Sequence, residues 1–137
     1  SYDMLGEGAR TTDAAAHYYK TYFESIEHIA AHANGGPRPG MSVKLSALHP
    51  RYEFAQRERC VPEMTEKLLG LARLAAAKNV NLTVDAEEVD RLALSLDIIR
   101  AVAADRSLNG WEGFGLAVQA YQKRAPRVVE YLSELAR

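Results

Sequence analysis

Apolar and polar residues alternate along this chain in two different rhythms. Short segments repeat with a period of two: the clearest lie at 41–46, 81–85 and 114–119, and a weaker one lies at 2–7. A period of two is typical of β-strands, whereas steps of three and four residues indicate amphipathic helices. The pattern therefore predicts four strands.

A segment with helical spacing follows each predicted strand. The first helix begins after Thr11-Thr12-Asp13, a good capping cluster, and ends at Asn34-Gly35-Gly36-Pro37, where proline cannot continue the ladder. The next three start near Pro62, soon after Glu87-Glu88, and at Pro126. The apolar positions expected to face the core are Ala16, Tyr19, Phe23, Ile26 and Ala30, then Met64, Leu68, Leu71 and Ala75, then Val89, Leu92, Leu96, Ile99 and Ala103, and finally Val128, Val129, Leu132 and Leu135.

Four alternations of strand and helix predict successive parallel βα units. Each strand has one apolar face and one polar face, which does not suit a doubly wound sheet covered by helices on both sides. A barrel explains the pattern, because one face packs on a ring of helices and the other points into the lumen. A complete barrel averages about 250 residues. We therefore expect an α/β fold with four successive βα units of a (β/α)8 TIM-like barrel, a half-barrel over residues 1–137.

Polar residues recur near the ends of the predicted strands. Lys44, Asp85 and Gln119 are 41 and 34 residues apart, about one βα repeat, and Glu7 keeps the same phase. The carboxyl ends of barrel strands carry the chemistry in this fold, so the residues predict a polar site. Two alternatives stay open: an interior ion pair of Lys44 and Asp85 that only fills the lumen, and a hydrogen-bonded lumen amide at Gln119.

Composition removes several classes of function. The chain has 17 Lys+Arg and 18 Asp+Glu, with no basic stripe, so we expect no nucleic-acid partner. No apolar run approaches the roughly 20 residues that cross a bilayer. The single cysteine, Cys60, suits a reducing compartment and is interpreted as an inert thiol. His28 and His32 have a spacing that can ligate zinc, but no further motif accompanies them, and we expect no metal.

Four long motifs follow one another in the chain. They are Tyr2–Glu7 (YDMLGE), Ser42–Tyr52 (SVKLSALHPRY), Asp85–Leu92 (DAEEVDRL) with Ser95–Asp97, and Gly110–Gly115 (GWEGFG) running into Val118–Arg124 (VQAYQKR). Together they strongly resemble the proline dehydrogenase domain of the bifunctional proline utilisation A (PutA) flavoenzymes. The resemblance covers nearly the whole chain, and its motifs coincide with the four strands that periodicity predicts.

This resemblance implies a distorted (β/α)8 barrel that binds FAD noncovalently and oxidises L-proline to Δ1-pyrroline-5-carboxylate, with electrons passed to a quinone. By position, Lys44 matches the lysine that pairs with the proline carboxylate, and Asp85 matches the active-site aspartate beside it. Glu7 matches an acidic residue that pairs with a substrate-binding arginine and helps to gate the site. The positions that match residues lining the flavin are Ala86, Ala117 and Gln119. The resemblance also implies a cytoplasmic protein whose complete form contacts the inner face of the cell membrane peripherally.

The match ends after the fourth unit, so we interpret the chain as an excised piece that lacks the second half of the barrel. Four strands leave two unpaired sheet edges. We therefore expect that the piece alone neither retains FAD nor oxidises proline, and that it self-associates. Two other classes stay open: a barrel lyase that uses Lys44 as a Schiff-base nucleophile, and a noncatalytic structural fragment.

Overall fold

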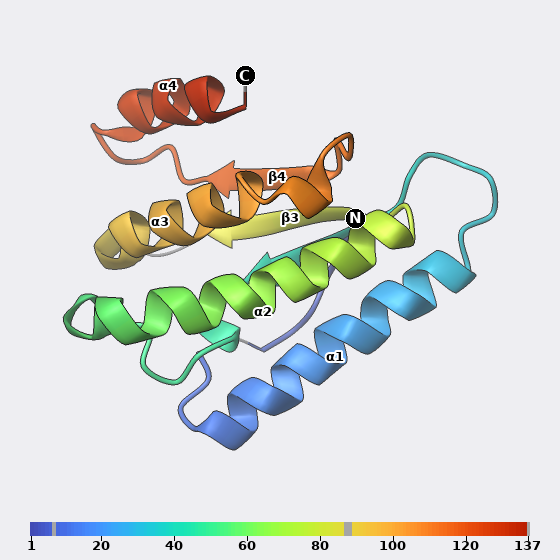
Figure 1. The fold of residues 1–137 in the computed structure, drawn as a ribbon, viewed down its shortest axis with the longest axis horizontal. Coiled ribbons are helices and arrows are strands. Elements are labelled where there is room, and N and C mark those ends of the chain that lie inside the picture. Colours follow the sequence, from blue (N-terminus) through green and yellow to red (C-terminus); the bar gives the residue numbers. More distant parts are fainter. Residues whose placement is uncertain (7, 87–88, 137) are drawn as a thin grey trace.

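The computed structural model describes residues 1–6, 8–86 and 89–136. Strand and helix alternate along the chain (Figure 1). The elements in chain order are β1 (Tyr2–Asp3), α1 (Thr12–Ala31), β2 (Gly40–Lys44), α2 (Arg57–Ala77), β3 (Asn81–Ala86), α3 (Leu92–Ala103), β4 (Phe114–Val118) and α4 (Ala125–Leu135).

The described strands form one parallel sheet in the order β1-β2-β3-β4. Its register places Val84 of β3 between Val43 of β2 and Leu116 of β4. Strands that follow one another in the sequence are therefore neighbours in the sheet, as expected for successive βα units. The predicted alternation of parallel strands and helices is confirmed.

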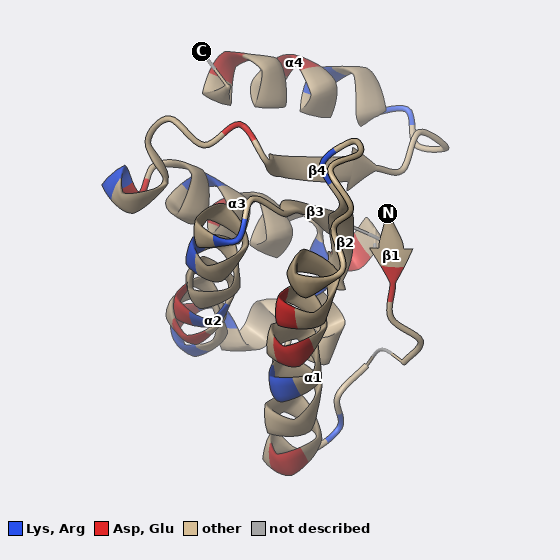
Figure 2. Cartoon of the chain, turned by 90° about the vertical axis from the view of Figure 1, so that its right-hand side faces the viewer, with Lys and Arg blue, Asp and Glu red and all other residues tan. Residues whose placement is uncertain are grey.

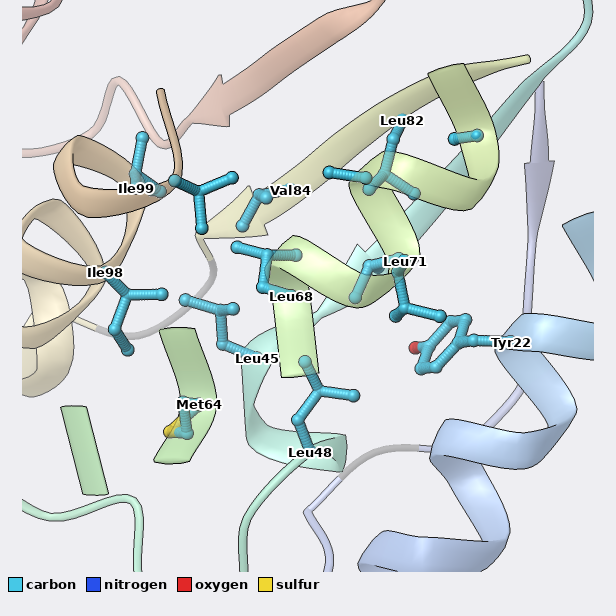
Figure 3. Close-up of a cluster of buried hydrophobic side chains, with 14 of the residues drawn as sticks. Tyr22, Leu45, Leu48, Met64, Leu68, Leu71, Leu82, Val84, Ile98 and Ile99 are labelled. Atoms are coloured by element: carbon cyan, nitrogen blue, oxygen red, sulfur yellow. The ribbon is translucent and has the colours of Figure 1, made fainter. Parts of the chain in front are cut away.

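Helices α1, α2 and α3 lie along one face of the sheet (Figures 1 and 2). Val43, Leu82 and Val84 point to that side and are fully buried. Figure 3 shows the side chains of α2, including Leu68 and Leu71, packed into this cluster. Burying a side chain of this size contributes about 1.5–3 kcal/mol, so this layer is the main source of stability. In the described part of the chain, no helix covers the opposite, polar face (Figure 2).

Helix α2 starts earlier than predicted. A 3-10 turn at Phe54–Gln56 leads directly into it at Arg57, and Pro62 lies inside the helix rather than at its start. Proline removes one intrahelical hydrogen bond, but Pro62 is exposed, so water can reach the carbonyl left without a partner. The predicted core positions of this helix are confirmed: Met64, Leu68, Leu71 and Ala75 are all buried.

The predicted apolar stripes of α1 and α3 are correct only in part: Tyr19 and Ala30 are partly buried against the core, as expected. Ala16, Phe23 and Ala103 are exposed, whereas Ile26 and Ile99 are buried as expected. Both helices have apolar residues on two neighbouring faces, so the sequence allows either face to be buried. Contact with α2 and the sheet determines which face packs in the core. The residues that the two helices bury are Ala15, Tyr22, Ile26 and Ile29 in α1, and Leu94, Ser95, Ile98, Ile99 and Val102 in α3.

Helix α4 lies at the β4 edge of the sheet (Figure 1). It carries Pro126 in its first turn, as predicted, but buries only Ala125 and Val128. Val129 is 52% exposed, so its predicted place in the core is wrong. None of the helices in the described residues combines the length and the apolar character needed to cross a membrane.

β1, β2 and β4 end earlier than the sequence pattern predicts, whereas β3 extends one residue further, to Ala86. β1 spans only Tyr2–Asp3, and β2 ends at Lys44, where the chain turns into a 3-10 turn at Leu45–Ala47. β4 ends at Val118, one position before Gln119. The polar residues therefore lie at the last strand positions or just beyond them, where parallel strands open into their βα loops.

Candidate functional site

A row of residues crosses the polar face of the sheet at its carboxyl edge. Lys44 of β2 is registered with Asp85 of β3, and Asp85 is registered with Ala117 of β4. Side chains at registered positions of parallel strands lie on the same face, and neighbouring strands are about 4.8 Å apart. The predicted lysine and aspartate therefore lie side by side.

Lys44 also contacts an acidic residue that the sequence analysis overlooked. Its Nζ atom lies 3.8 Å from Asp3 Oδ2 of β1, with the lysine side chain 15% exposed and the aspartate 57% exposed. Asp3 is registered with Ser42, two positions before Lys44, so both side chains belong to the polar face. Asp3 would have been found if the polar face of β2 had been aligned with the residues of β1. A strand of two residues, however, gives too weak a periodic signal for that alignment.

The remaining candidate residues do not all lie in this row. Glu7 lies outside the described residues. Ala86 is the last residue of β3 and is registered with Val118. Gln119 follows β4, is exposed, and borders a cavity of about 30 Å3 between the end of that strand and the start of α4. Only Lys44, Asp85 and Ala117 therefore share the registered row.

Hydrogen bonds between consecutive βα loops hold the carboxyl edge together. After β1, the Gly8 N–H donates to Ser46 Oγ (3.2 Å) and the Ala9 N–H to the Ser46 carbonyl (2.9 Å). After β4, Arg124 Nη2 donates to the Val89 carbonyl at 2.6 Å. These bonds tie the loop after β1 to the loop after β2, and the loop after β4 to the segment after β3.

The loop after β2 is joined to the segment after β3 by one aromatic side chain. Tyr52 is 5% exposed, and its hydroxyl donates to the Arg91 carbonyl at 3.4 Å. The Arg91 guanidinium lies over the same ring, 5.1 Å from its centroid. A cation above a ring face is attracted by the ring quadrupole, so Tyr52 holds Arg91, at the start of α3, against the loop after β2.

A second anchor fixes the loop after β2 to helix α2. His49, 6% exposed, accepts the Arg51 N–H at Nδ1 (3.0 Å), so its Nε2 carries the proton and donates to Glu63 (3.1 Å). Hydrogen bonds from Arg59 and then from His49 hold the pKa of Glu63 below its ordinary value. This loop begins directly after Lys44. The contacts of His49 with Arg51 and Glu63 therefore restrain the loop that follows the site lysine.

On the polar face, the residues of β4 nearest to Asp85 have small side chains. Gly115 and Ala117 of β4 are small, and a methyl group added at Gly115 would lie 3.6 Å from Thr83 Oγ1, an ordinary contact. The carboxylate of Asp85 accepts hydrogen bonds and the amide of Gln119 both donates and accepts. These residues therefore fit a flavin as one wall of its site.

The other chemical candidates are weak. No group of three or more His, Cys, Asp or Glu side chains that could hold a metal ion occurs in the described residues. Cys60 is fully buried, and this burial raises the pKa of its thiol, so the thiolate is disfavoured. Both observations support the interpretation of Cys60 as an inert thiol.

The chain matches relatives of known family along its whole length. The family model of proline dehydrogenase matches residues 1–137. The bifunctional protein PutA of Salmonella typhimurium is 46% identical over 139 residues, which cover 99% of this chain and 10% of that protein. The bifunctional protein PutA of Rhizobium meliloti is 44% identical over 144 residues, covering 100% of this chain and 11% of that protein.

Solved structures agree with this assignment. A crystal structure of a Bradyrhizobium japonicum proline utilization A (PutA) mutant superposes with a TM-score of 0.97 at 57% identity, covering 100% of this chain and 14% of that one. PutA from Bdellovibrio bacteriovorus, inactivated by N-propargylglycine, superposes with a TM-score of 0.90 over 98% of this chain and 15% of its own, but at 24% identity it shows the fold alone. The chain spans about a tenth of the length of the curated relatives. Matched by the family model from its first residue to its last, it belongs to the proline dehydrogenase family.

Proposed function

We propose that residues 1–137 are the first half of the (β/α)8 barrel of a proline dehydrogenase domain and supply part of the site that oxidises L-proline to Δ1-pyrroline-5-carboxylate. The observation that carries this proposal is the registered pair of Lys44 and Asp85 at the carboxyl ends of β2 and β3. Family membership supports it. A solved structure of a PutA that is 57% identical to this chain has proline bound in remote sites.

Lys44 binds the carboxylate of proline in this proposal. Proline is a small zwitterion, so one end of its site needs a cation. The lysine is 15% exposed, and the Asp3 carboxylate 3.8 Å away attracts its ammonium across the polar face. A partly desolvated cation attracts a carboxylate more strongly than one in open water.

Asp85 stabilises the charge that develops as proline is oxidised. Once the ring ammonium has released a proton to solvent, loss of a hydride from the ring carbon beside nitrogen leaves a positive iminium on the substrate, and a neighbouring carboxylate lowers the energy of that state. Registered beside Lys44, Asp85 can face the nitrogen while the lysine holds the carboxylate. Each charged end of the substrate then has its own partner.

FAD, when bound, supplies the hydride acceptor. Ala117 and Ala86 would border it, and Gln119 would offer its amide to the ring. Glu7 is assigned, through the family resemblance, to pair with a substrate-binding arginine and to gate the site. The small side chains on the polar face of β4 support the placement of the flavin next to Asp85.

A Schiff-base role for Lys44 is less favoured by this geometry. A nucleophilic lysine must be a neutral amine, and neighbouring carboxylates stabilise the charged ammonium instead. Lys44 has Asp3 at 3.8 Å and Asp85 as its registered neighbour. Borohydride trapping of a carbonyl substrate on Lys44 would reverse this preference.

Two substitutions test the catalytic assignments in a protein that spans the whole domain. Lys44→Ala should raise the KM for proline about 10- to 100-fold, the loss expected for a hydrogen bond to a charged group. Asp85→Asn should lower kcat about 100-fold or more while the KM changes less. Lys20→Ala, at an exposed lysine of α1 that pairs with Glu24, is the matched control. An unchanged KM in Lys44→Ala contradicts the carboxylate assignment.

We propose further that the 137-residue chain alone neither retains FAD nor oxidises proline, and that it self-associates. Its sheet ends at β1 and β4, and Tyr2 (59% exposed) and Leu5 (96% exposed) lie at the β1 edge. Exposed apolar side chains beside an unpaired strand favour association. An absorption spectrum and sedimentation velocity on the purified chain test both points, and a yellow monomer contradicts them.

The proposal extends to the complete protein through its family resemblance. It assigns a quinone as the electron acceptor, a cytoplasmic location and a peripheral contact with the inner face of the cell membrane. Co-flotation of the complete protein with lipid vesicles, with and without proline, tests the membrane contact, and reduction of a soluble quinone analogue tests the acceptor. Absence of both would remove these assignments and leave those of Lys44 and Asp85 untouched.

A further inference from the structure

A buried tyrosine hydroxyl contacts the backbone of the lysine that we assign to the substrate. Tyr22 projects from α1 into the core cluster (Figure 3) and is fully buried. Its hydroxyl oxygen accepts a hydrogen bond from the backbone N–H of Lys44, with 3.1 Å between nitrogen and oxygen. A helix on the apolar side of the sheet therefore reaches the last residue of β2.

This contact replaces one that β1 is too short to make. The ladder between β1 and β2 ends with the pair Asp3 and Ser42, whereas β2 continues to Lys44. Directly afterwards the chain bends into the 3-10 turn at Leu45–Ala47, whose residues are all buried. A buried N–H without an acceptor is costly, so the end of the strand needs a partner from outside the sheet.

The hydroxyl of Tyr22 is not needed for packing. Phenylalanine would fill nearly the same volume among the apolar residues around the ring. A phenol group in an apolar core is destabilising unless it is hydrogen-bonded, and its oxygen accepts the Lys44 N–H. The role of the hydroxyl group is therefore to hold the backbone at the end of β2.

We propose that Tyr22 is a positioning residue for Lys44: its hydroxyl fixes the backbone from which the lysine side chain crosses the polar face toward the substrate carboxylate. The inference rests on the proposed function of Lys44. An ion-pairing group displaced by about 1 Å loses much of its effect on a bound substrate. With Tyr22 in place, the Lys44 ammonium already lies 3.8 Å from Asp3, on the side of the sheet where proline would bind.

The test compares Tyr22→Phe with Tyr19→Phe. Tyr19 is the matched control, because it is a half-buried tyrosine of the same helix for whose hydroxyl the described residues supply no hydrogen bond. In the 137-residue chain, Tyr22→Phe should speed hydrogen exchange of the Lys44 amide about tenfold or more and leave the Leu82 and Val84 amides of β3 protected. Tyr19→Phe should change none of these rates.

In a protein that spans the whole domain, Tyr22→Phe should raise the KM for proline about 3- to 10-fold, the loss of one hydrogen bond, with kcat within about twofold. A double-mutant cycle separates positioning from general destabilisation. If Tyr22 acts through Lys44, Tyr22→Phe adds no further rise in KM to the Lys44→Ala protein. A merely structural role predicts the same loss in both backgrounds.

The KM values of the single and double variants distinguish the role of Tyr22 from that of Lys44. An unchanged KM in Tyr22→Phe, or an equal rise in the Lys44→Ala background, overturns the inference and leaves the assignment of Lys44 standing. An unchanged KM in Lys44→Ala overturns both, and the exchange rate of its amide still reports whether Tyr22 holds the strand end. If Tyr22→Phe does not fold, an amide-to-ester replacement at residue 44 deletes the same donor and must give the same rise in KM.

Discussion

The centre of the sheet and its two flanks differ in how much of their surface is covered. In β2 and β3, Val43, Leu82 and Val84 are fully buried beneath α2 and its neighbours. In β4, no residue between Phe114 and Val118 is fully buried. At the β1 flank, Tyr2 remains 59% exposed. The centre of the sheet is a fully buried hydrophobic core. The two flanks expose apolar surface that additional polypeptide or a second molecule would cover.

The same difference divides the candidate site. Lys44 and Asp85 stand on the two best-covered strands, so their backbone positions are held by the main hydrophobic layer. Ala117 and Gln119, the positions assigned to the flavin, belong to the weakly covered β4 flank. The residues proposed to bind the substrate are therefore held by the stable centre, whereas those proposed to line the flavin lie on the weakly covered β4 flank.

The largest expected effect contrasts one leucine in each region. Leu68→Ala in α2 removes a fully buried side chain and should lower the free energy of unfolding by about 2–5 kcal/mol. Leu132→Ala in α4 removes a half-buried side chain beside an open groove of about 530 Å3 and should cost less than about 1.5 kcal/mol. Urea unfolding followed by circular dichroism measures both, and equal losses would show that the α4 flank is as well packed as the centre.

The next effect concerns how the β4 flank is anchored. A methyl group added at Gly113 would overlap the indole of Trp111, 2.7 Å from its Cζ2 atom, so Gly113→Ala should displace the ring and cost about 1–3 kcal/mol. Trp111 is the single tryptophan of the chain, so its fluorescence should shift to the red without interference. Gly36→Ala, whose methyl group meets no atom within 4 Å, is the control. An unshifted spectrum in Gly113→Ala would contradict this anchoring.

The sequence predicts the centre of the molecule better than the flanks, for physical reasons. Period-two alternation is strong where one face packs on helices and the other is polar, so it located β2, β3 and the pair Lys44 and Asp85. β1 has two residues, too few for any periodicity, so Asp3 was missed. The bond from Tyr22 to Lys44 joins residues 22 positions apart through the hydroxyl alone, and no local pattern predicts it.

The helices show a second limit of sequence patterns. In α2, Met64, Leu68 and Leu71 form a single apolar stripe, and its prediction is confirmed. In α1, Tyr19 and Phe23 suggested a stripe, yet the helix turns Tyr22 inward. Aromatic residues at helical spacing indicate that a helix is amphipathic. Which of two adjacent aromatic side chains is buried depends on the neighbouring elements that the helix contacts.

A smaller effect tests the tie between the β1 flank and the centre. Ser46, 8% exposed, accepts the Gly8 N–H through its hydroxyl, so Ser46→Ala leaves that amide without its partner. The expected cost is about 1 kcal/mol, together with faster hydrogen exchange at Gly8. The carbonyl of residue 46 still accepts the Ala9 N–H, so the Ala9 amide should stay protected. Ser42→Ala, at a half-buried serine of β2, provides the comparison, and equal exchange at Gly8 in both variants would contradict the tie.

The smallest expected effect is a pH dependence in the anchor of the loop after β2. Arg59 first and His49 second lower the pKa of Glu63 from its ordinary value of 4.5, so the ionised carboxylate stabilises the folded chain. That stabilisation is present above the ordinary value and is lost as the pH falls from there through the lowered pKa of the folded state.

Glu63→Gln should therefore cost up to about 1 kcal/mol at pH 7, because this half-exposed group is screened by solvent and the glutamine oxygen can still accept one of the two hydrogen bonds, from Arg59 or from His49. The difference from the unmodified chain should shrink as the pH falls below about 4.5. Unfolding by urea at a series of pH values measures it, and Glu58→Gln, at an exposed glutamate of the same helix, is the control. A difference that grows toward low pH would mean that the neutral carboxyl, rather than the carboxylate, holds His49 and the loop that leaves Lys44.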